Sequence, residues 1–88
     1  MTFAEFQATR HWHDNLEAAN PNAFGSKTGY AYLKNEVCID DVTSWNDPAR
    51  LAQGRWYLCI ANQEWQSDDL AELEQRLYEW AVREGYEI

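Results

Sequence analysis

A chain of 88 residues fits one small domain, because chains of this length bury only roughly 60% of their unfolded surface and cannot divide it between two cores. Five Trp, five Tyr and three Phe supply a core and argue against a disordered acidic chain. The net charge of −8 disfavours unselective binding to nucleic-acid phosphates or to an anionic membrane. We therefore expect a single small acidic domain over residues 1–88, without a direct nucleic-acid or membrane partner.

The N-terminal segment predicts a helix over residues 3–19. Thr2 and Glu5 have the T-x-x-E spacing of a capping box, in which the first side chain caps the helix that follows. Pro21 disfavours helical geometry in the residue before it, so the helix should end by Asn20.

The helix assignment decides how the two histidines of "RHWHD" are interpreted. On a helix, His11 and His13 point about 160° apart and cannot ligate one ion. We then expect His13 at the edge of the core and His11 in solvent. A metal would need Glu17 together with ligands from distant segments, so we expect no metal site.

The segment "YAYLKNEVCIDDV" alternates in polarity on both sides of Lys34-Asn35, which predicts two strands joined by a two-residue turn. Such a turn would pair Tyr32 with Val37 and Tyr30 with Ile39 on one apolar face. The opposite, mixed face would carry Ala31, Leu33, Glu36 and Cys38.

The segment "RWYLCIAN" is apolar on both alternations and predicts a central strand. A turn at Asn62-Gln63 would then bring Trp65 opposite Ile60 in a short further strand. A long amphipathic helix should follow, with Ser67 as its N-cap and Gly85 just after its end.

The apolar arc of this C-terminal helix is roughly 200° wide, which is more than one sheet face usually covers. Part of it should therefore meet the first helix or a second chain. Glu74 lies inside the arc, so it must reach solvent or meet a cation from its own chain or a partner. The arc holds Leu70, Leu73, Leu77, Trp80 and Ala81, extended by Ala71, Tyr78 and Val82.

Together these elements predict a two-layer α+β domain in the order α-β-β-β-β-α. An antiparallel sheet of three to four strands would lie between an N-terminal helix and the long C-terminal helix.

Catalytic signatures are scarce in the sequence: it contains no G-x-S-x-G elbow, P-loop, H-E-x-x-H or dinucleotide fingerprint. Asp40-Asp41 would face opposite ways on a strand, and Asp68-Asp69 would stabilise the start of a helix. Cys38 and Cys59 lie in apolar runs without a C-x-x-C motif, which predicts reduced, packed thiols and disfavours a nucleophile pair of Cys59 with His13. We expect no enzyme and no cofactor.

A domain of this size cannot easily bury five tryptophan side chains. Trp45 lies in a polar loop beside Asp41 and Asp47, and we expect it to be partly exposed as an interface anchor. The alternative is that loop aromatics fold back over the edge of the sheet. The preferred function is a non-catalytic domain that acts through protein–protein contact, with homodimerisation as one form. The residues assigned to this contact are Trp45, Tyr57, Leu33, Ala31, Glu74, Asp40, Asp41 and Asp47.

The alternative function is an acidic decoy that inhibits a basic nucleic-acid-binding protein by occupying its groove. Duplex DNA presents one negative charge per roughly 1.7 Å, so a decoy needs an uninterrupted row of carboxylates. Arg76 and Arg83 interrupt such a row on the C-terminal helix. A second patch could hold Glu36, Asp40, Asp41, Asp47 and Glu64.

The sequence also suggests where the protein acts. No apolar run approaches the roughly 18 residues of a membrane span, and the N-terminus lacks the basic start and apolar stretch of a secretory signal. We therefore expect a cytoplasmic protein.

Overall fold

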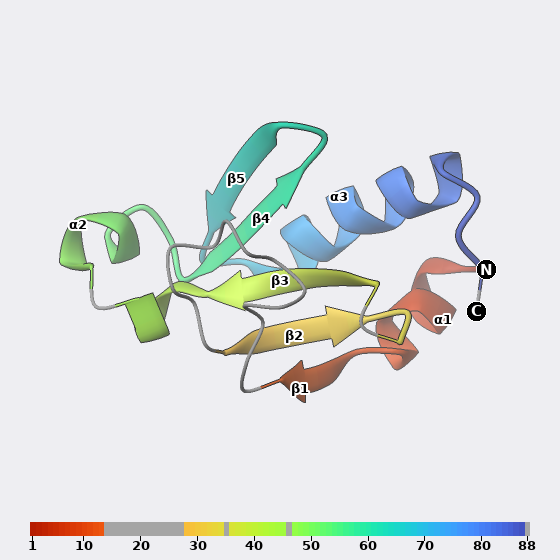
Figure 1. The fold of residues 1–88 in the computed structure, drawn as a ribbon, viewed down its shortest axis with the longest axis horizontal. Helices are drawn as coiled ribbons and strands as arrows, with labels where there is room; N and C mark the ends of the chain where they lie inside the picture. Colours follow the sequence, from red (N-terminus) through yellow and green to blue (C-terminus); the bar gives the residue numbers. More distant parts are fainter. Residues whose placement is uncertain (14–27, 35, 46, 88) are drawn as a thin grey trace.

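The computed structural model describes residues 1–13, 28–34, 36–45 and 47–87. One antiparallel sheet has the strand order β1-β2-β3-β4-β5, so each strand pairs with the next one along the chain (Figure 1). The predicted α+β class is confirmed, with five strands in place of three to four. The elements are α1 (Phe3–Ala8), β1 (His11–His13), β2 (Gly29–Tyr32), β3 (Val37–Asp41), the 3₁₀ helix η1 (Val42–Trp45), α2 (Pro48–Leu51), β4 (Trp56–Ile60), β5 (Gln63–Ser67) and α3 (Leu70–Arg83).

The N-terminal helix is much shorter than predicted. The capping box of Thr2 and Glu5 is present, but α1 ends at Ala8 and the chain continues as the strand β1. The Thr9 hydroxyl donates to the carbonyl of Phe6 at 2.7 Å and so competes with further helical turns. The prediction of a helix through residue 19 is wrong for residues 9–13, and its remainder lies outside the described residues.

Strand β1 forms by hydrogen bonding to the backbone groups along the outer edge of β2. His11 pairs with Ala31 and His13 pairs with Gly29, so β1 supplies partners to backbone groups that β2 would otherwise leave open. Thr9 assists by accepting a hydrogen bond from the backbone N–H of Leu33 at 3.1 Å, which ties the start of β1 to the end of β2. Tertiary pairing therefore ends early the helix that the capping box begins.

The β2–β3 hairpin has the predicted register, with Tyr32 opposite Val37 and Tyr30 opposite Ile39. Leu33 does not lie on the mixed face as predicted. Its φ of 50° turns the chain at the end of β2, and its side chain packs into the buried core beneath the helices. Of the predicted turn, Asn35 lies outside the described residues.

The turn of the β4–β5 hairpin lies one residue earlier than predicted, which shifts the pairing of the two strands by two residues. Ala61 and Asn62 have φ values of 51° and 65°, the left-handed geometry of a tight hairpin turn. Trp65 therefore lies opposite Leu58, and the predicted pairing with Ile60 is wrong. A shift of two residues keeps every side chain on its predicted face because the side-chain period of a strand is two.

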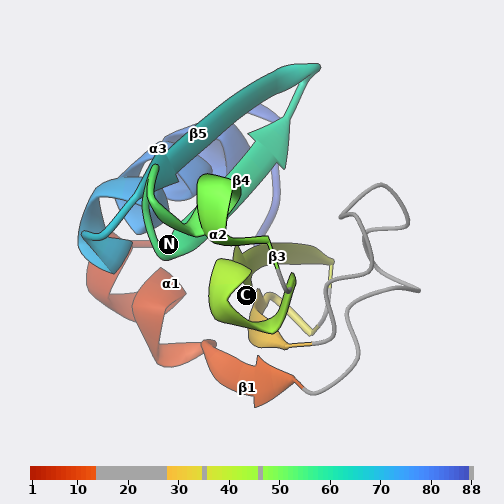
Figure 2. The ribbon, with the colours of Figure 1, turned by 90° about the vertical axis from the view of Figure 1, so that its left-hand side faces the viewer.

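Helix α3 covers one face of the sheet at β4 and β5, and α1 packs beside it (Figures 1 and 2). Asp69 caps α3 in place of Ser67, and Gly85 follows its end with a φ of 82°, as predicted. We call the buried cluster under these helices the main core. It holds Phe6, Tyr32, Leu33, Val37, Ile39, Trp56, Leu58, Leu73, Leu77 and Ala81.

The apolar arc of α3 is partly covered by α1, which is the first of the two alternatives that the sequence left open. Tyr78 contacts the rings of Phe3 and Phe6, and its hydroxyl donates to the carbonyl of Met1 at 3.0 Å. Ala71 and Val82, at the margins of the arc, stay exposed.

A second cluster lies on the opposite face of the sheet. It consists of Val42 and Trp45 from η1 and Tyr57 from β4. The guanidinium of Arg50 lies 5.4 Å from the ring centres of both Trp45 and Tyr57. The prediction that Trp45 stands partly exposed is wrong, since only 8% of it is accessible. The other interpretation, an aromatic ring folded back over the sheet, describes this residue.

Candidate functional site

Glu74 is the buried carboxylate that the helix pattern singled out, and it meets a cation of its own chain. Arg10 donates from Nη1 to Oε2 at 3.1 Å, and Tyr32 donates its hydroxyl to the same oxygen at 2.7 Å. Gln7 donates to the other oxygen at 3.1 Å. Burial and the hydrogen bond to Glu74 together raise the pKa of Tyr32 well above its usual range. This network joins α1, β2 and α3.

Asp41 forms a second carboxylate–arginine pair at the far end of β3. Arg55 donates from Nε at 3.3 Å and from Nη2 at 3.2 Å, a bidentate contact. Burial alone would raise the pKa of Asp41, but hydrogen bonds from Arg55 and Thr43 outweigh it and lower that pKa below its ordinary value. The same contact raises the pKa of Arg55, so both partners stay charged at neutral pH.

Both arginines lie against a row of aromatic rings. Trp12 meets Tyr30 edge-on at 5.1 Å between ring centres, and Tyr30 stacks on Trp56 at 5.5 Å. Arg10 lies 5.1 Å from the centre of the Tyr30 ring, and Arg55 lies 4.6 Å from that of Trp56. We call these five residues the aromatic–arginine surface.

Strand pairing explains why these residues gather. Trp12 lies opposite Tyr30, and Trp56 lies opposite Asp41, so the three rings share the sheet face that carries the main core. Their row lies at the margin of that core and leaves Trp12 45% exposed. The side chains of Arg10 and Arg55 are 39% and 51% exposed, while Glu74 and Asp41 beneath them are buried.

Sequence reasoning missed this surface because it placed Trp12 on a helix. The available signal was the alternation of aromatic and polar residues in "RHWH", which fits a strand as well as a helical turn.

The residues assigned to a partner contact from the sequence lie elsewhere. Seven of the eight are buried within the chain: Trp45, Tyr57, Leu33, Ala31, Glu74, Asp40 and Asp41. Asp47 is exposed and caps α2 by accepting from the backbone N–H of Arg50 at 3.2 Å. Burial leaves the seven little surface for a partner. It also removes Asp40 and Asp41 from the acidic patch that the decoy hypothesis needs.

Both cysteines are free thiols, as predicted, but they are not both packed. Cys59 is exposed near the end of β4, and Cys38 is partly exposed on β3. The β3–β4 ladder places Asp40 opposite Tyr57, and the two strands diverge from there toward the hairpin tip (Figure 1). Both cysteines line a hollow of about 240 Å³ whose other lining residues come from the same two strands and from α3.

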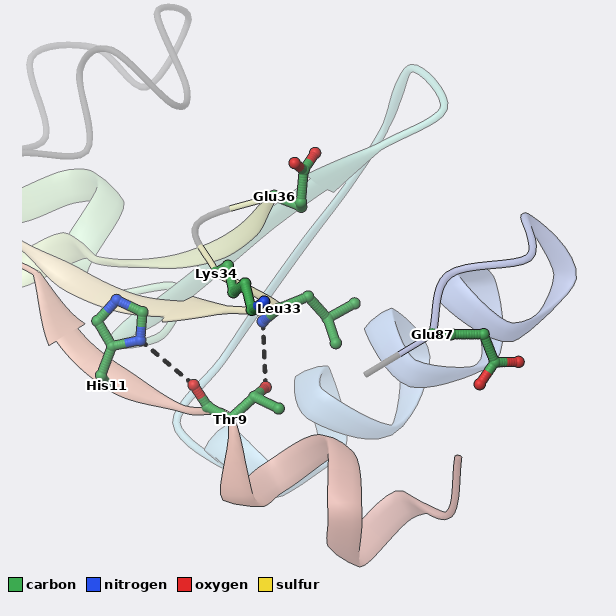
Figure 3. A pocket seen from close by; sticks show the side chains of 6 residues that line it. All are labelled: Thr9, His11, Leu33, Lys34, Glu36 and Glu87. Atoms are coloured by element: carbon green, nitrogen blue, oxygen red, sulfur yellow. Dashed lines mark hydrogen bonds between the residues drawn. The ribbon is translucent and has the colours of Figure 1, made fainter.

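A hollow of about 440 Å³ lies between the start of β1 and the β2–β3 turn (Figure 3). Its lining residues are Thr9, His11, Leu33, Lys34, Glu36 and Glu87. Figure 3 shows the carboxylates of Glu36 and Glu87 pointing away from each other, so these charges do not converge on a common point. A ligand site normally has a few polar groups that do converge, and this hollow lacks that property.

No protein-family model matches the chain, and neither a curated protein nor a solved structure matches it significantly. Within the described part of the chain, no helix is long and apolar enough to cross a membrane. The same residues contain no group of three or more His, Cys, Asp or Glu side chains placed to hold a metal ion.

Proposed function

We propose that this protein is a non-catalytic module that binds a protein partner through the aromatic–arginine surface. The observation that carries the proposal is the 45% exposed ring of Trp12 at the end of the row that continues through Tyr30 to Trp56. Trp56 itself is buried in the main core, and the partly exposed arginines Arg10 and Arg55, which lie on Tyr30 and Trp56, supply the accessible part of the row there. Trp, Tyr and Arg are the residue types most enriched among side chains that dominate protein-binding energy. Here the three types form one continuous patch.

The surface is also pre-organised. Each arginine is fixed from below by a buried carboxylate and from the side by an aromatic ring, so little rotamer freedom remains to be lost when a partner binds. Immobilising a side chain on binding costs about 0.5–1.5 kcal/mol, and a chain that has already immobilised it avoids that cost.

Charge separates this proposal from the acidic decoy. Glu74 and Asp41 largely cancel the arginine charges locally, so the contact depends on ring burial and short hydrogen bonds. Such a contact should persist as salt is raised, whereas a decoy that holds a basic protein through its net charge of −8 should release it.

The test is affinity capture from cell extract at low and high salt, followed by binding measurements with the captured protein. Trp12→Ala should weaken binding by at least about 30-fold, corresponding to a loss of about 2 kcal/mol, and should lower the free energy of unfolding by only about 1 kcal/mol, the size of its edge-on contact with Tyr30. Val82→Ala is the matched control, because Val82 is also an exposed apolar residue, at 48%, but lies on α3 away from the row. Equal binding by wild type and Trp12→Ala contradicts the proposal.

Two narrower proposals accompany this one. A cytoplasmic location agrees with two free cysteines, one of them exposed, because oxidising compartments favour disulfides. Self-association is the second form that the contact can take. A mass measurement of the free protein, made with and without Trp12→Ala, distinguishes a second copy from a different partner.

A further inference from the structure

Two arginines supply the cations of the aromatic–arginine surface. The histidines of β1 do not contribute to it, because residues two apart on a strand point to the same side. His11 and His13 therefore share the face of β1 opposite to Trp12, and the expectation that their rings diverge is wrong for this backbone. The side chains of Arg10 and Arg55 lie on the row itself and are partly exposed.

Both guanidinium groups have N–H donors beyond those that hold them in place. A guanidinium group carries five N–H donors and no acceptor. Arg10 donates to Glu74 from Nη1, and Arg55 donates to Asp41 from Nε and Nη2. These are the side-chain hydrogen bonds of the two arginines within the described part of the chain. The Nε and Nη2 groups of Arg10 and the Nη1 group of Arg55 are therefore placed to donate to a partner.

The acceptors on the partner should be uncharged. Each arginine is already paired with a buried carboxylate, and the net charge of −8 repels an acidic partner. Backbone carbonyl oxygens are neutral acceptors, but in most peptides each residue also brings an N–H donor that costs free energy if it is buried without an acceptor. Proline brings the carbonyl without the N–H.

The shape of a proline-rich segment also fits the row. A polyproline II helix has no internal hydrogen bonds, so its carbonyl oxygens stay open to donors, and one turn rises about 9.3 Å. The rings of Trp12, Tyr30 and Trp56 follow one another at 5.1 and 5.5 Å between centres, so the row is about as long as one such turn. Aromatic side chains are the usual docking surface for proline-rich segments.

We infer that the partner presents a proline-rich segment in the polyproline II conformation to the aromatic–arginine surface. Its proline rings pack on Trp12 and Tyr30, and its carbonyl oxygens accept hydrogen bonds from Arg10 and Arg55. The inference names the class of partner for the proposed surface, and so it rests on the proposed function.

The direct test is an NMR titration of the protein with decaproline, acetylated and amidated so that the peptide carries no charge. The chain has five tryptophans, and the indole N–H signal that is missing from Trp12→Ala identifies Trp12. That signal should shift on addition of decaproline, and Trp12→Ala should weaken binding at least about 10-fold. An alanine–serine peptide of equal length, with the same blocked ends, restores the backbone N–H groups and should also bind at least about 10-fold more weakly.

Three results of this titration overturn the inference. They are an unshifted Trp12 signal at millimolar decaproline, equal binding of the two peptides, and equal binding of decaproline by wild type and Trp12→Ala.

Arg55→Lys tests the hydrogen bonds separately from the ring contacts. Lysine keeps the positive charge beside Asp41 but lacks the planar fork that holds the carboxylate and still presents a fixed N–H to a partner. The variant should weaken decaproline binding about fivefold, the effect of one hydrogen bond. Arg83→Lys, in the last turn of α3, is the matched control and should leave binding unchanged. Equal binding by wild type and Arg55→Lys overturns the inference.

The capture experiment separates this inference from the proposed function. If Trp12→Ala weakens binding of the captured protein but decaproline does not bind, the surface binds a partner that is not proline-rich, and only the inference is overturned. If Trp12→Ala changes neither interaction, the inference and the proposed function are both overturned.

Discussion

The main core and the second cluster lie on opposite faces of one sheet. The residues that contact one another in the main core are much further apart along the chain than those in the second cluster. In the main core, Glu74 bonds to Gln7 and Tyr32, which are 67 and 42 residues away. The second cluster joins Val42, Trp45 and Tyr57 within one short stretch. A cluster closed locally can open while the rest of the fold persists, whereas the main core should be lost only with global unfolding.

The largest effect is expected in the main core. Leu77→Ala should lower the free energy of unfolding by about 4 kcal/mol, because a fully buried leucine loses its transfer energy and leaves a cavity under α3. Urea unfolding followed by circular dichroism measures it, and Val82→Ala, on the same helix but exposed, should change stability by less than about 0.5 kcal/mol. Similar losses for the two variants would remove the distinction between the covered and open sides of α3.

A somewhat smaller effect is expected in the second cluster. Trp45→Ala should cost about 3 kcal/mol, the low end for a buried tryptophan, since the cluster contains only three buried residues. Hydrogen exchange should show faster exchange over residues 42–52 before any change in α3. If exchange rises equally in both segments, the two clusters form one cooperative unit. The variant also tests the role first assigned to Trp45, because a buried tryptophan should affect stability before partner binding.

The smallest effect at neutral pH concerns the hydroxyl that joins β2 to α3. Tyr32→Phe should cost about 1.5 kcal/mol, as expected for a hydrogen bond to a charged group. The folded state raises the pKa of Tyr32, so its contribution is complete below the ordinary value of 10.0 and is lost as pH rises above it. The stability difference between wild type and variant should therefore shrink above pH 10. A constant difference between pH 8 and pH 11 would show that Tyr32 ionises equally in both states.

The parts of the fold that sequence predicted well are those with strong local signals. The β2–β3 register follows from alternation about Lys34, and the buried face of α3 follows from its 3.6-residue period. A cation of its own chain was one of three alternatives that the sequence left open for Glu74, beside solvent and a partner's cation, and the choice of Arg10 depended on where β1 runs.

The candidate surface was not predictable in the same way. Arg10, Trp12, Tyr30 and Trp56 lie in three separate strands or their flanks, and nothing local indicates that their rings meet. The capping box correctly marked where α1 begins, yet no Gly or Pro marks its end at Ala8. The helix α1 ends at Ala8 because the following residues pair with the edge of β2. A pairing partner so distant along the chain cannot be identified from the residues around Ala8.

Local sequence alone determined the acidic composition, the capped start of α1, the β2–β3 pairing and the amphipathic α3, because capping, alternation and helical period act between residues a few positions apart. Tertiary structure decided that His11–His13 is a strand and that Trp45 is covered, because backbone pairing across the sheet and burial of large rings outweigh weak local preferences. It therefore also decided that Trp12 and the two histidines lie on opposite faces of one edge strand.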